Sequence, residues 1–366
     1  SMSHSKEKVI IIGVRLLDTS RSSFDESMNE LEKLVETARG QVIVRLEQTL
    51  KSPVPATYVG KGKLEEVKQI LDEHEAFTVV FDEDLKPNQA RNIENALGRD
   101  VKVIDRSGLI LDIFATRART SAAKIQVELA QLEYILPRLS GMWAHFSRQY
   151  GGSIGARGPG ETQLETDRRV IRRRIAALHT KLDKIEVQRR TQRRARSSQF
   201  RVSLLGYTNA GKSTLINRLT NASAFAEDKL FATLDPRTRK FRTRDGRTAL
   251  FTDTVGFIRK LPHHLIESFR STLAEAIEAD LLLIVADASH EALDEHLSVV
   301  EDELSRMRLQ DANKLLIFNK IDITDEFRLC EIKHNYPEGL LISAKSSEGI
   351  DVLIDSVLSF ANSVSK

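Results

Sequence analysis

Cysteine is almost absent from this chain of 366 residues, because Cys330 is the only one. A single cysteine excludes a disulfide within the chain and is typical of a protein from a reducing compartment. Long apolar runs are also missing. The longest, Leu281–Ala286, is far shorter than the roughly 20 residues that a membrane-spanning helix requires. We therefore expect a cytoplasmic protein that does not enter a membrane.

An excess of one charge is lacking as well, since 55 Lys and Arg residues face 52 Asp and Glu residues and leave a net charge of +3. So small a value does not establish a polyanionic partner, and the distribution of the charges matters more. The length suffices for two or three domains of roughly 100–200 residues each. Changes in sequence pattern predict domains at 1–118, 119–198 and 199–366.

Residues 1–118 alternate between strand-like and helix-like segments. Strands are expected at 9–14, 41–46, 77–81 and 101–104, and helices at 24–38, 63–74 and 88–97. This rhythm is typical of an α/β domain with a largely parallel sheet.

Residues 119–198 carry apolar side chains at heptad spacing instead. One stripe runs from Ile125 through Trp143 to Phe146, and a second from Leu164 to Ile185. Between them, residues 151–160 contain five glycines and a proline, which break a helix. The pattern predicts an antiparallel coiled-coil helical hairpin with this Gly-rich loop at its tip.

The second helix of the predicted hairpin is strongly basic. From Arg168 to Arg196 it carries twelve positive charges, and Asp183 and Glu186 are its only acids. Such a run can be a solvated helix face, and that interpretation stays open. The one-sided charge nevertheless favours nucleic-acid contact, because Lys and Arg neutralise phosphates and release their counterions.

Residues 199–366 return to an α/β rhythm and predict an open, mostly parallel, doubly wound sheet. Strands are expected at 201–205, 248–252, 281–286, 315–318 and 340–342.

Residues 206–213 read Gly-Tyr-Thr-Asn-Ala-Gly-Lys-Ser and fit the phosphate-loop pattern Gly-x4-Gly-Lys-Ser, between an apolar strand and an expected helix at 214–219. The N–H groups of such a loop and the following helix N-terminus attract phosphates. We expect Lys212 to reach the β- and γ-phosphates and Ser213 to offer its hydroxyl to Mg²⁺. The predicted nucleotide contacts here are Gly206, Tyr207, Thr208, Asn209, Ala210, Gly211, Lys212, Ser213 and Thr214.

A second motif, Asp253-Thr-Val-Gly256, ends an expected strand. Asp253 is expected to hold Mg²⁺ through water, and the Gly256 N–H to meet the γ-phosphate. Thr233 is the expected γ-phosphate sensor and Mg²⁺ ligand, with Thr238 and Thr243 as alternatives. The predicted catalytic set is thus Lys212, Thr233, Asp253 and Gly256.

Two further motifs predict selection of guanine. Asp322, in Asn319-Lys-Ile-Asp322, is expected to accept hydrogen bonds from the guanine N1–H and exocyclic amine, a donor pair that adenine lacks. Base contacts are predicted for Asn319, Lys320, Asp322, Ser343, Ala344 and Lys345. Four motifs in this order, each after a strand, predict a Ras-like P-loop G domain and a GTPase.

Phe257 follows Gly256, where Ras-like GTPases have a glutamine that orients the attacking water. Phenylalanine cannot do this, so slow intrinsic hydrolysis and an external activator are expected. Asn209 lies where potassium-activated GTPases have an asparagine, which suggests stimulation by K⁺.

Three segments resemble the HflX family: Gln126–Tyr134, Gly151–Arg169 with its Gly-Pro-Gly-Glu-Thr-Gln-Leu-Glu run, and Phe231–Pro236. The resemblance implies a ribosome-associated GTPase with an N-terminal α/β domain, a helical hairpin and a G domain. It implies binding to the large ribosomal subunit and its RNA, and a role in splitting or rescuing stalled ribosomes under stress. The RNA contacts expected in and beside the hairpin loop are Arg148, Arg157, Arg168, Arg169, Arg172 and Arg173.

Two other interpretations stay open. One is a regulatory GTPase whose coiled-coil arm docks a protein partner, and the other is an RNA-binding module that uses nucleotide only for stability. In each case we expect a monomer with GTP or GDP, Mg²⁺ and K⁺ as ligands. Many family members continue past the G domain into a small C-terminal domain. This chain stops at Lys366, so no function of that domain is expected from these residues.

Overall fold

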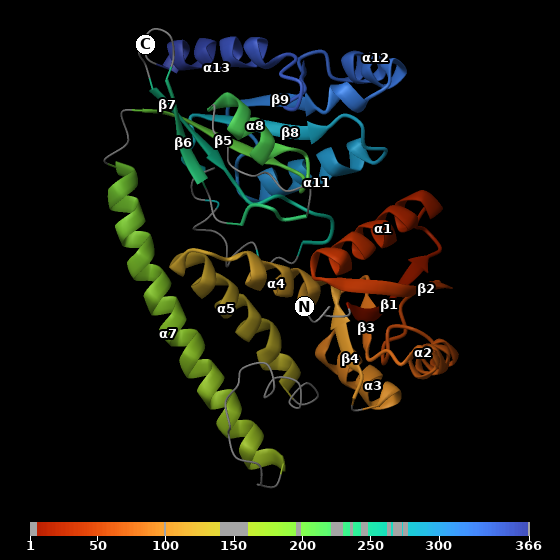
Figure 1. Ribbon diagram of the computed structural model, residues 1–366. Helices are drawn as coiled ribbons and strands as arrows, with labels where there is room; N and C mark the ends of the chain where they lie inside the picture. Colours follow the sequence, from red (N-terminus) through yellow and green to blue (C-terminus); the bar gives the residue numbers. More distant parts are fainter. Residues whose placement is uncertain are drawn as a thin grey trace, which may run out of the picture. The chain divides into compact units, whose positions relative to one another are not determined.

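The computed structural model describes residues 6–98, 100–139, 160–194, 199–220, 230–234, 237–242, 248–261, 265, 273 and 277–364. The chain divides into two compact units. The first comprises Ser1–Thr116 with Lys124–Asp183, and the second Arg117–Ala123 with Lys184–Lys366. Each unit has its own sheet (Figure 1). The three-domain division stays a prediction. Among the described residues, no helix is long and apolar enough to cross a bilayer.

The sheet of the first unit is entirely parallel, with strand order β2-β1-β3-β4. Its strands are β1 (Glu7–Leu16), β2 (Gly40–Leu50), β3 (Thr78–Phe81) and β4 (Lys102–Asp105). Helices α1 (Arg21–Thr37), α2 (Lys61–His74), α3 (Pro87–Leu97) and α4 (Arg106–Arg117) join or follow them. The continuous apolar run of β1 is buried, as expected of a central parallel strand.

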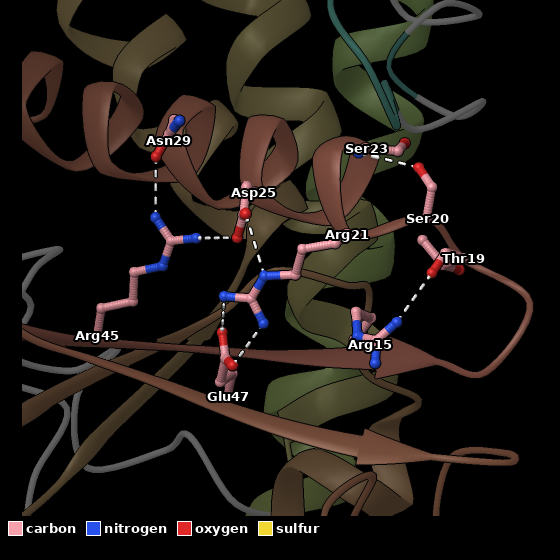
Figure 2. Close-up of polar contacts among 9 residues, drawn as sticks. All are labelled: Arg15, Thr19, Ser20, Arg21, Ser23, Asp25, Asn29, Arg45 and Glu47. Carbon is pink, nitrogen blue, oxygen red and sulfur yellow. Dashed lines mark hydrogen bonds and ion pairs between the residues drawn. The ribbon is translucent and has the colours of Figure 1, made fainter.

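Helix α1 begins at Ser20, whose hydroxyl accepts a hydrogen bond from the Ser23 N–H at 3.1 Å. Its apolar residues at helical spacing are buried, as predicted. Figure 2 shows polar contacts between a more exposed flank of α1 and β2, where Arg21 contacts Asp25 and Glu47, and Arg45 contacts Asp25 and Asn29. Exposed ion pairs of this kind stabilise by only about 0–1 kcal/mol, so apolar burial fixes α1 on the sheet.

Helix α4 was not predicted. It starts directly after β4 and buries residues on nearly every side, including Leu109, Ile110, Leu111 and Phe114. A helix that is buried on nearly every side lacks the narrow apolar stripe by which helices are recognised in a sequence.

Helices α5 (Ser121–Ile135) and α7 (Gly160–Arg194) lie side by side (Figure 1). Their heptad stripes meet in one apolar cluster that includes Leu129, Leu132, Ile171 and Leu178. The expected unbroken helix from Ile125 to Phe146 is wrong. α5 ends at Ile135 and a 3-10 turn, Leu136–Arg138, follows, because Pro137 cannot donate a helical hydrogen bond. Trp143 and the Gly-rich loop lie outside the described residues, so the closed hairpin stays a prediction.

The sheet of the second unit has the order β10-β9-β8-β5-β7-β6. It consists of β5 (Phe200–Gly206), β6 (Arg237–Arg242), β7 (Thr248–Asp253), β8 (Leu281–Asp287), β9 (Lys314–Asn319) and β10 (Leu340–Leu341). Its helices include α8 (Lys212–Leu219), α11 (Leu293–Arg306), α12 (Glu326–Asn335) and α13 (Ile350–Val364). All strand pairs are parallel except β6 with β7, which confirms the doubly wound α/β prediction. Strand β6 was not predicted, because its sequence RTRKFR contains a single apolar residue.

Candidate nucleotide-binding site

A cavity of about 290 Å³ opens in the second unit at the ends of β5, β7 and β9. This is where open α/β sheets bind their ligands. The cavity brings together residues from all four predicted motifs. Its lining residues are Thr208, Asn209, Gly211, Lys212, Ser213, Thr214, Phe231, Ala232, Thr233, Thr254, Gly256, Asn319, Lys320, Asp322, Ile323, Ala344 and Lys345.

The loop between β5 and α8 has a backbone that few sequences can adopt. Asn209 has φ +64°, a left-handed conformation that asparagine tolerates, and Gly211 has φ +94°. A Cβ at Gly211 would lie 2.3 Å from Asn319 Nδ2. The second glycine of the motif is therefore required by both conformation and space.

Lys212 begins α8 and is almost completely buried. Its Nζ donates to the Tyr207 carbonyl at 2.9 Å and to the Gly206 carbonyl at 3.3 Å. Burial lowers the pKa of Lys212 to about 8, Asp253 opposes this shift, and Lys320 adds to it. An anion in the cavity would stabilise the charged ammonium, so this lysine is suited to phosphate.

Three oxygen atoms converge beside Lys212. The Ser213 hydroxyl donates to Asp253 Oδ2 at 2.6 Å, the Thr233 hydroxyl donates to the same oxygen at 2.8 Å, and the two hydroxyls lie 2.7 Å apart. Asp253 Oδ1 is buried and has no hydrogen-bond partner within the described part of the chain. Two hydroxyls and a carboxylate with a spare oxygen are hard ligands of the kind that Mg²⁺ prefers, so these residues fit the predicted magnesium site.

The alternatives to Thr233 do not join this cluster. Thr238 lies on β6, and its hydroxyl pairs with that of Thr252 at 3.0 Å. Thr243 lies outside the described residues. Among the described threonines proposed as the sensor, the structure thus brings Thr233 to Ser213 and Asp253.

The expected base-binding motifs meet at one end of the cavity. Asn319 links them, since its Nδ2 donates to the Ala210 carbonyl at 3.0 Å and its Oδ1 accepts from the Ala344 N–H at 2.9 Å. The Ser343 hydroxyl donates to Asp322 Oδ1 at 2.7 Å and thereby orients that carboxylate. Asn319 and Asp322 both line the cavity, but the Asn319 amide is engaged with the loop and with Ala344, so Asn319 positions the motifs, whereas Asp322 can accept from a base.

Lys320 is held at the rim of the cavity. Its Nζ donates to the Asn209 carbonyl at 2.9 Å and lies 2.7 Å from Asp287 Oδ2. Lys345 also lines the cavity, and its carbonyl and that of Ala344 accept hydrogen bonds from Arg218.

Phe257 turns its side chain into the core, where it is 1% exposed. Its backbone pairs with the loop, because its N–H donates to the Gly206 carbonyl at 3.0 Å and its carbonyl accepts from the Thr208 N–H at 2.6 Å. At the preceding Gly256, a Cβ would lie 2.7 Å from Thr208 Cα. Phe257 therefore offers no polar side-chain atom to a water molecule in the cavity.

Sequence motifs missed the contacts of the loop side chains. The Tyr207 ring stacks on His296 of α11 with centroids 3.6 Å apart, and its hydroxyl accepts from the Arg259 N–H at 2.8 Å. The Thr208 hydroxyl accepts from the Phe231 N–H at 2.8 Å. The residues of these pairs are far apart in sequence, so no local sequence pattern predicts their contacts.

The predicted RNA contacts are only partly described. Arg169, Arg172 and Arg173 are exposed on α7 and Arg168 is half-buried. Arg174, in contrast, is tied to both carboxylate oxygens of Glu128, at 2.7 and 3.0 Å. Arg148 and Arg157 lie outside the described residues.

Three protein families match successive parts of the chain. Residues 25–115 match a family described as "GTP-binding GTPase N-terminal". Residues 117–196 match "GTP-binding GTPase Middle Region", and residues 201–320 match "50S ribosome-binding GTPase".

Individual relatives point the same way. GTPase HflX of Flavobacterium psychrophilum is 50% identical over 316 residues, which cover 86% of this chain and 76% of the relative. GTPase HflX of Escherichia coli K12 is 44% identical over 336 residues, covering 91% and 78%. Among solved structures, a complex of SsGBP with GDP is 26% identical with a TM-score of 0.54, and covers 98% of this chain and all of its own. The chain therefore belongs to the HflX family of GTPases.

Proposed function

We propose that this chain is a GTP-driven factor that binds the large ribosomal subunit and dissociates or rescues stalled ribosomes, particularly under stress. The observation that carries the proposal is the exposed cationic face of α7. Arg169, Arg172 and Arg173 form no ion pair or hydrogen bond through their side chains with any described residue, so they are available to phosphates. Arg168 would contribute from the same helix, and Arg148 and Arg157 from the preceding segment.

The family description also supports this partner. The match over residues 201–320 is to GTPases described as 50S ribosome-binding. Since ribosomes work in the cytoplasm, the proposal places the chain there, acting as a monomer.

In the proposed reaction, water attacks the γ-phosphorus of GTP and the bond to the leaving β-phosphate oxygen breaks, giving GDP and phosphate. The Lys212 ammonium contacts the β- and γ-phosphates, and the Gly256 N–H contacts the γ-phosphate. Ser213, Thr233 and Asp253 would hold Mg²⁺, which supplies positive charge to the β- and γ-phosphates when bound. Asp322, oriented by Ser343, reads guanine.

We further propose that intrinsic hydrolysis is slow and that the ribosome accelerates it. The burial of Phe257 supports this, because this position provides no group that could orient the attacking water. K⁺ would contribute positive charge near Asn209, which lines the cavity. Equal GTP turnover in potassium and sodium buffers would refute that part.

The main test measures GTP turnover by the full chain with and without purified large ribosomal subunits. We expect a stimulation of tenfold or more for the native chain. The triple variant R169Q/R172Q/R173Q should lose most of it, because three phosphate contacts are removed. A matched control, R91Q/R308Q/K333Q, removes three exposed cations elsewhere and should behave as the native chain does. If subunits neither bind nor raise the rate, the proposal is wrong.

A protein partner is the second candidate, favoured by two exposed valines on α7, Val170 at 52% and Val187 at 67%. Salt separates the two. RNA binding should weaken steeply between 50 and 200 mM salt, by roughly 10-fold or more for a few phosphate contacts, whereas an apolar docking arm should not.

A further inference from the structure

Strand β6, at the edge of the second sheet, has an unusual concentration of positive charge. From Arg237 to Arg247 the sequence holds six cations and one acid, Asp245. Four of these cations are described and lie on β6: Arg237, Arg239, Lys240 and Arg242. None of them has a side-chain hydrogen bond or ion pair with any described residue. They form a cationic strand that no described carboxylate neutralises.

The geometry of β6 presents these cations on both sides of the sheet edge. In the antiparallel register, Arg239 lies opposite Phe251 and Lys240 lies opposite Leu250. Residues two apart share a face at a spacing of about 7 Å. Lys240 and Arg242, both exposed, therefore stand side by side on one face. Such a row can follow the phosphates of an extended polyanion.

The strand is also directly connected to the nucleotide cavity. Arg237 lies four positions after Thr233 and pairs in register with Asp253. Thr233 and Asp253 are the groups whose hydroxyl and carboxylate meet beside Lys212. If Thr233 and Asp253 change position when a γ-phosphate is gained or lost, that change therefore reaches the start of β6.

We propose that β6 is a second RNA-binding surface, whose cations contact phosphates of the large-subunit RNA more tightly in the GTP state than in the GDP state. This inference rests on the proposed function. Because coupling between two ligands is reciprocal, RNA bound at β6 raises the affinity for GTP over GDP by the same factor.

The chemistry of β6 favours RNA over an acidic protein. Protein interfaces rely on large apolar or aromatic anchors at their centre. The aromatic residue of β6, Phe241, turns inward and packs edge-on against Phe251, with ring centroids 5.8 Å apart. The large hydrophobic side chains exposed in the described part of this unit lie on other elements: Val187, Ile277, Ile323, Phe327 and Val352. The three arginines on β6 have planar forks that suit phosphate oxygens.

The test measures binding of the full, fluorescently labelled chain to purified large ribosomal subunits across a salt series. Each series is run with a non-hydrolysable GTP analogue and with GDP. The variant K240Q/R242Q removes one lysine and one arginine from one face of β6. The control R308Q/K333Q removes the same charges from exposed positions with no described partner.

With the GTP analogue, we expect K240Q/R242Q to bind about tenfold more weakly than the control. The negative slope of log affinity against log salt should become less steep by roughly 1.4–1.8, as for two lost phosphate contacts. With GDP, the loss should be smaller. Equal affinities of variant and control would overturn the inference, and so would equal losses with both nucleotides. In either case subunit binding by the native chain would leave the proposed function intact, whereas failure of the native chain to bind would overturn both.

A photo-crosslinker in place of Thr238, which is exposed on the same face as Lys240 and Arg242, identifies the chemical class of the partner. Crosslinks to RNA, removed by ribonuclease, are expected with the GTP analogue. Crosslinks to ribosomal protein alone would overturn the assignment to RNA.

Discussion

Both sheets place buried carboxylates at strand ends, but among Asp82, Asp105 and Asp253 only Asp253 has a carboxylate oxygen without a hydrogen-bond partner in the described part of the chain. In the first unit, Asp82 follows β3 and its carboxylate is fully engaged. Arg106 donates to Asp82 Oδ1 at 2.6 Å and also contacts Glu30, and the Ser27 hydroxyl donates to Asp82 Oδ2 at 2.7 Å. The position of a strand end therefore does not by itself make a ligand site.

Asp105, at the end of β4, is saturated in the same way. It accepts from the backbone N–H groups of Leu85 and Gly108, both at 2.9 Å, and from the Tyr134 hydroxyl at 2.6 Å. These bonds tie β4 to α4 and α5. Both carboxylates are thus saturated within the first unit, although Arg106 Nε is buried without a hydrogen-bond partner among the described residues.

In the second unit, the corresponding polar groups are not fully hydrogen-bonded within the described part of the chain. Asp253 Oδ1 is buried without a described partner, and burial lowers the pKa of Lys212 to about 8. Asp322 is oriented by Ser343 but faces a cavity. The second unit differs because its fixed and incompletely satisfied groups lie at or beside one cavity, which is the mark of a ligand site.

The largest expected effect comes from breaking the saturated cluster of carboxylates around Arg106. Arg106→Met leaves Glu30 and Asp82 buried without their cation, which should lower the free energy of unfolding by about 3–5 kcal/mol. The matched control is Arg21→Met, because Arg21 also bridges two carboxylates, Asp25 and Glu47, but is exposed (Figure 2). The control should cost less than about 1 kcal/mol. Urea denaturation measures both, and equal losses would contradict the distinction between the buried and exposed clusters.

The second effect tests the unsatisfied cluster. Asp253→Asn keeps an oxygen that accepts from Ser213 and Thr233, so the free protein should unfold within about 1 kcal/mol of the native chain. Magnesium-dependent GTP turnover should fall about 100-fold, or about 2.7 kcal/mol, because the carboxylate charge is lost. Asp302→Asn, on the exposed side of α11, is the control and should leave turnover unchanged. If Asp253→Asn destabilised the protein as much as Arg106→Met, Asp253 would be a structural group like Asp82, and the proposed difference between the two sheets would be wrong.

Sequence reasoning predicted this second cluster because its information is local. The loop 206–213, Asp253 and Asp322 each follow an apolar strand, and parallel strands carry such residues to one edge of the sheet. Most strands and helices were predicted for the same reason, since their apolar periodicity matches the burial observed.

The saturated cluster could not be predicted in this way. Arg106 meets Glu30 across 76 positions of sequence, and Tyr207 meets His296 across a similar span, so no spacing reveals either pair. Elements with unusual composition were missed as well. Helix α4 is buried on nearly every side and β6 is mostly charged, so neither shows an amphipathic pattern.

A smaller effect is expected from removing the hydrogen bond that the Ser343 hydroxyl donates to Asp322 in the second unit. Ser343→Ala removes the hydroxyl that orients Asp322, so GDP affinity should weaken about fivefold, or about 1 kcal/mol. The control Ser356→Ala removes an exposed hydroxyl on α13 that bonds only its own helix. Titration with a fluorescent GDP derivative measures both, and unchanged affinity in Ser343→Ala would mean that Asp322 needs no orienting group.

The smallest effect comes from Glu94 on α3, a partly buried carboxylate of the first unit. Its side chain has no hydrogen bond or ion pair with the described residues, and burial raises the pKa of Glu94 to about 7. A raised carboxyl pKa means that the folded state binds the proton more tightly than the unfolded state. The stabilising contribution is therefore complete below about pH 4.5 and is lost as the pH rises through 7.

Glu94→Gln should therefore raise the free energy of unfolding by about 1 kcal/mol at pH 8, a value reduced for the side chain's contact with solvent, and change little at pH 4.5. The control is Glu65→Gln, because Glu65 is an exposed glutamate on the neighbouring helix α2 with no side-chain partner among the described residues. It should change the free energy of unfolding little at either pH. Urea denaturation at several pH values provides the measurement. If Glu94→Gln destabilised the chain at pH 8, the Glu94 carboxylate would have a stabilising partner, and Glu94 would resemble the paired carboxylates Asp82 and Asp105.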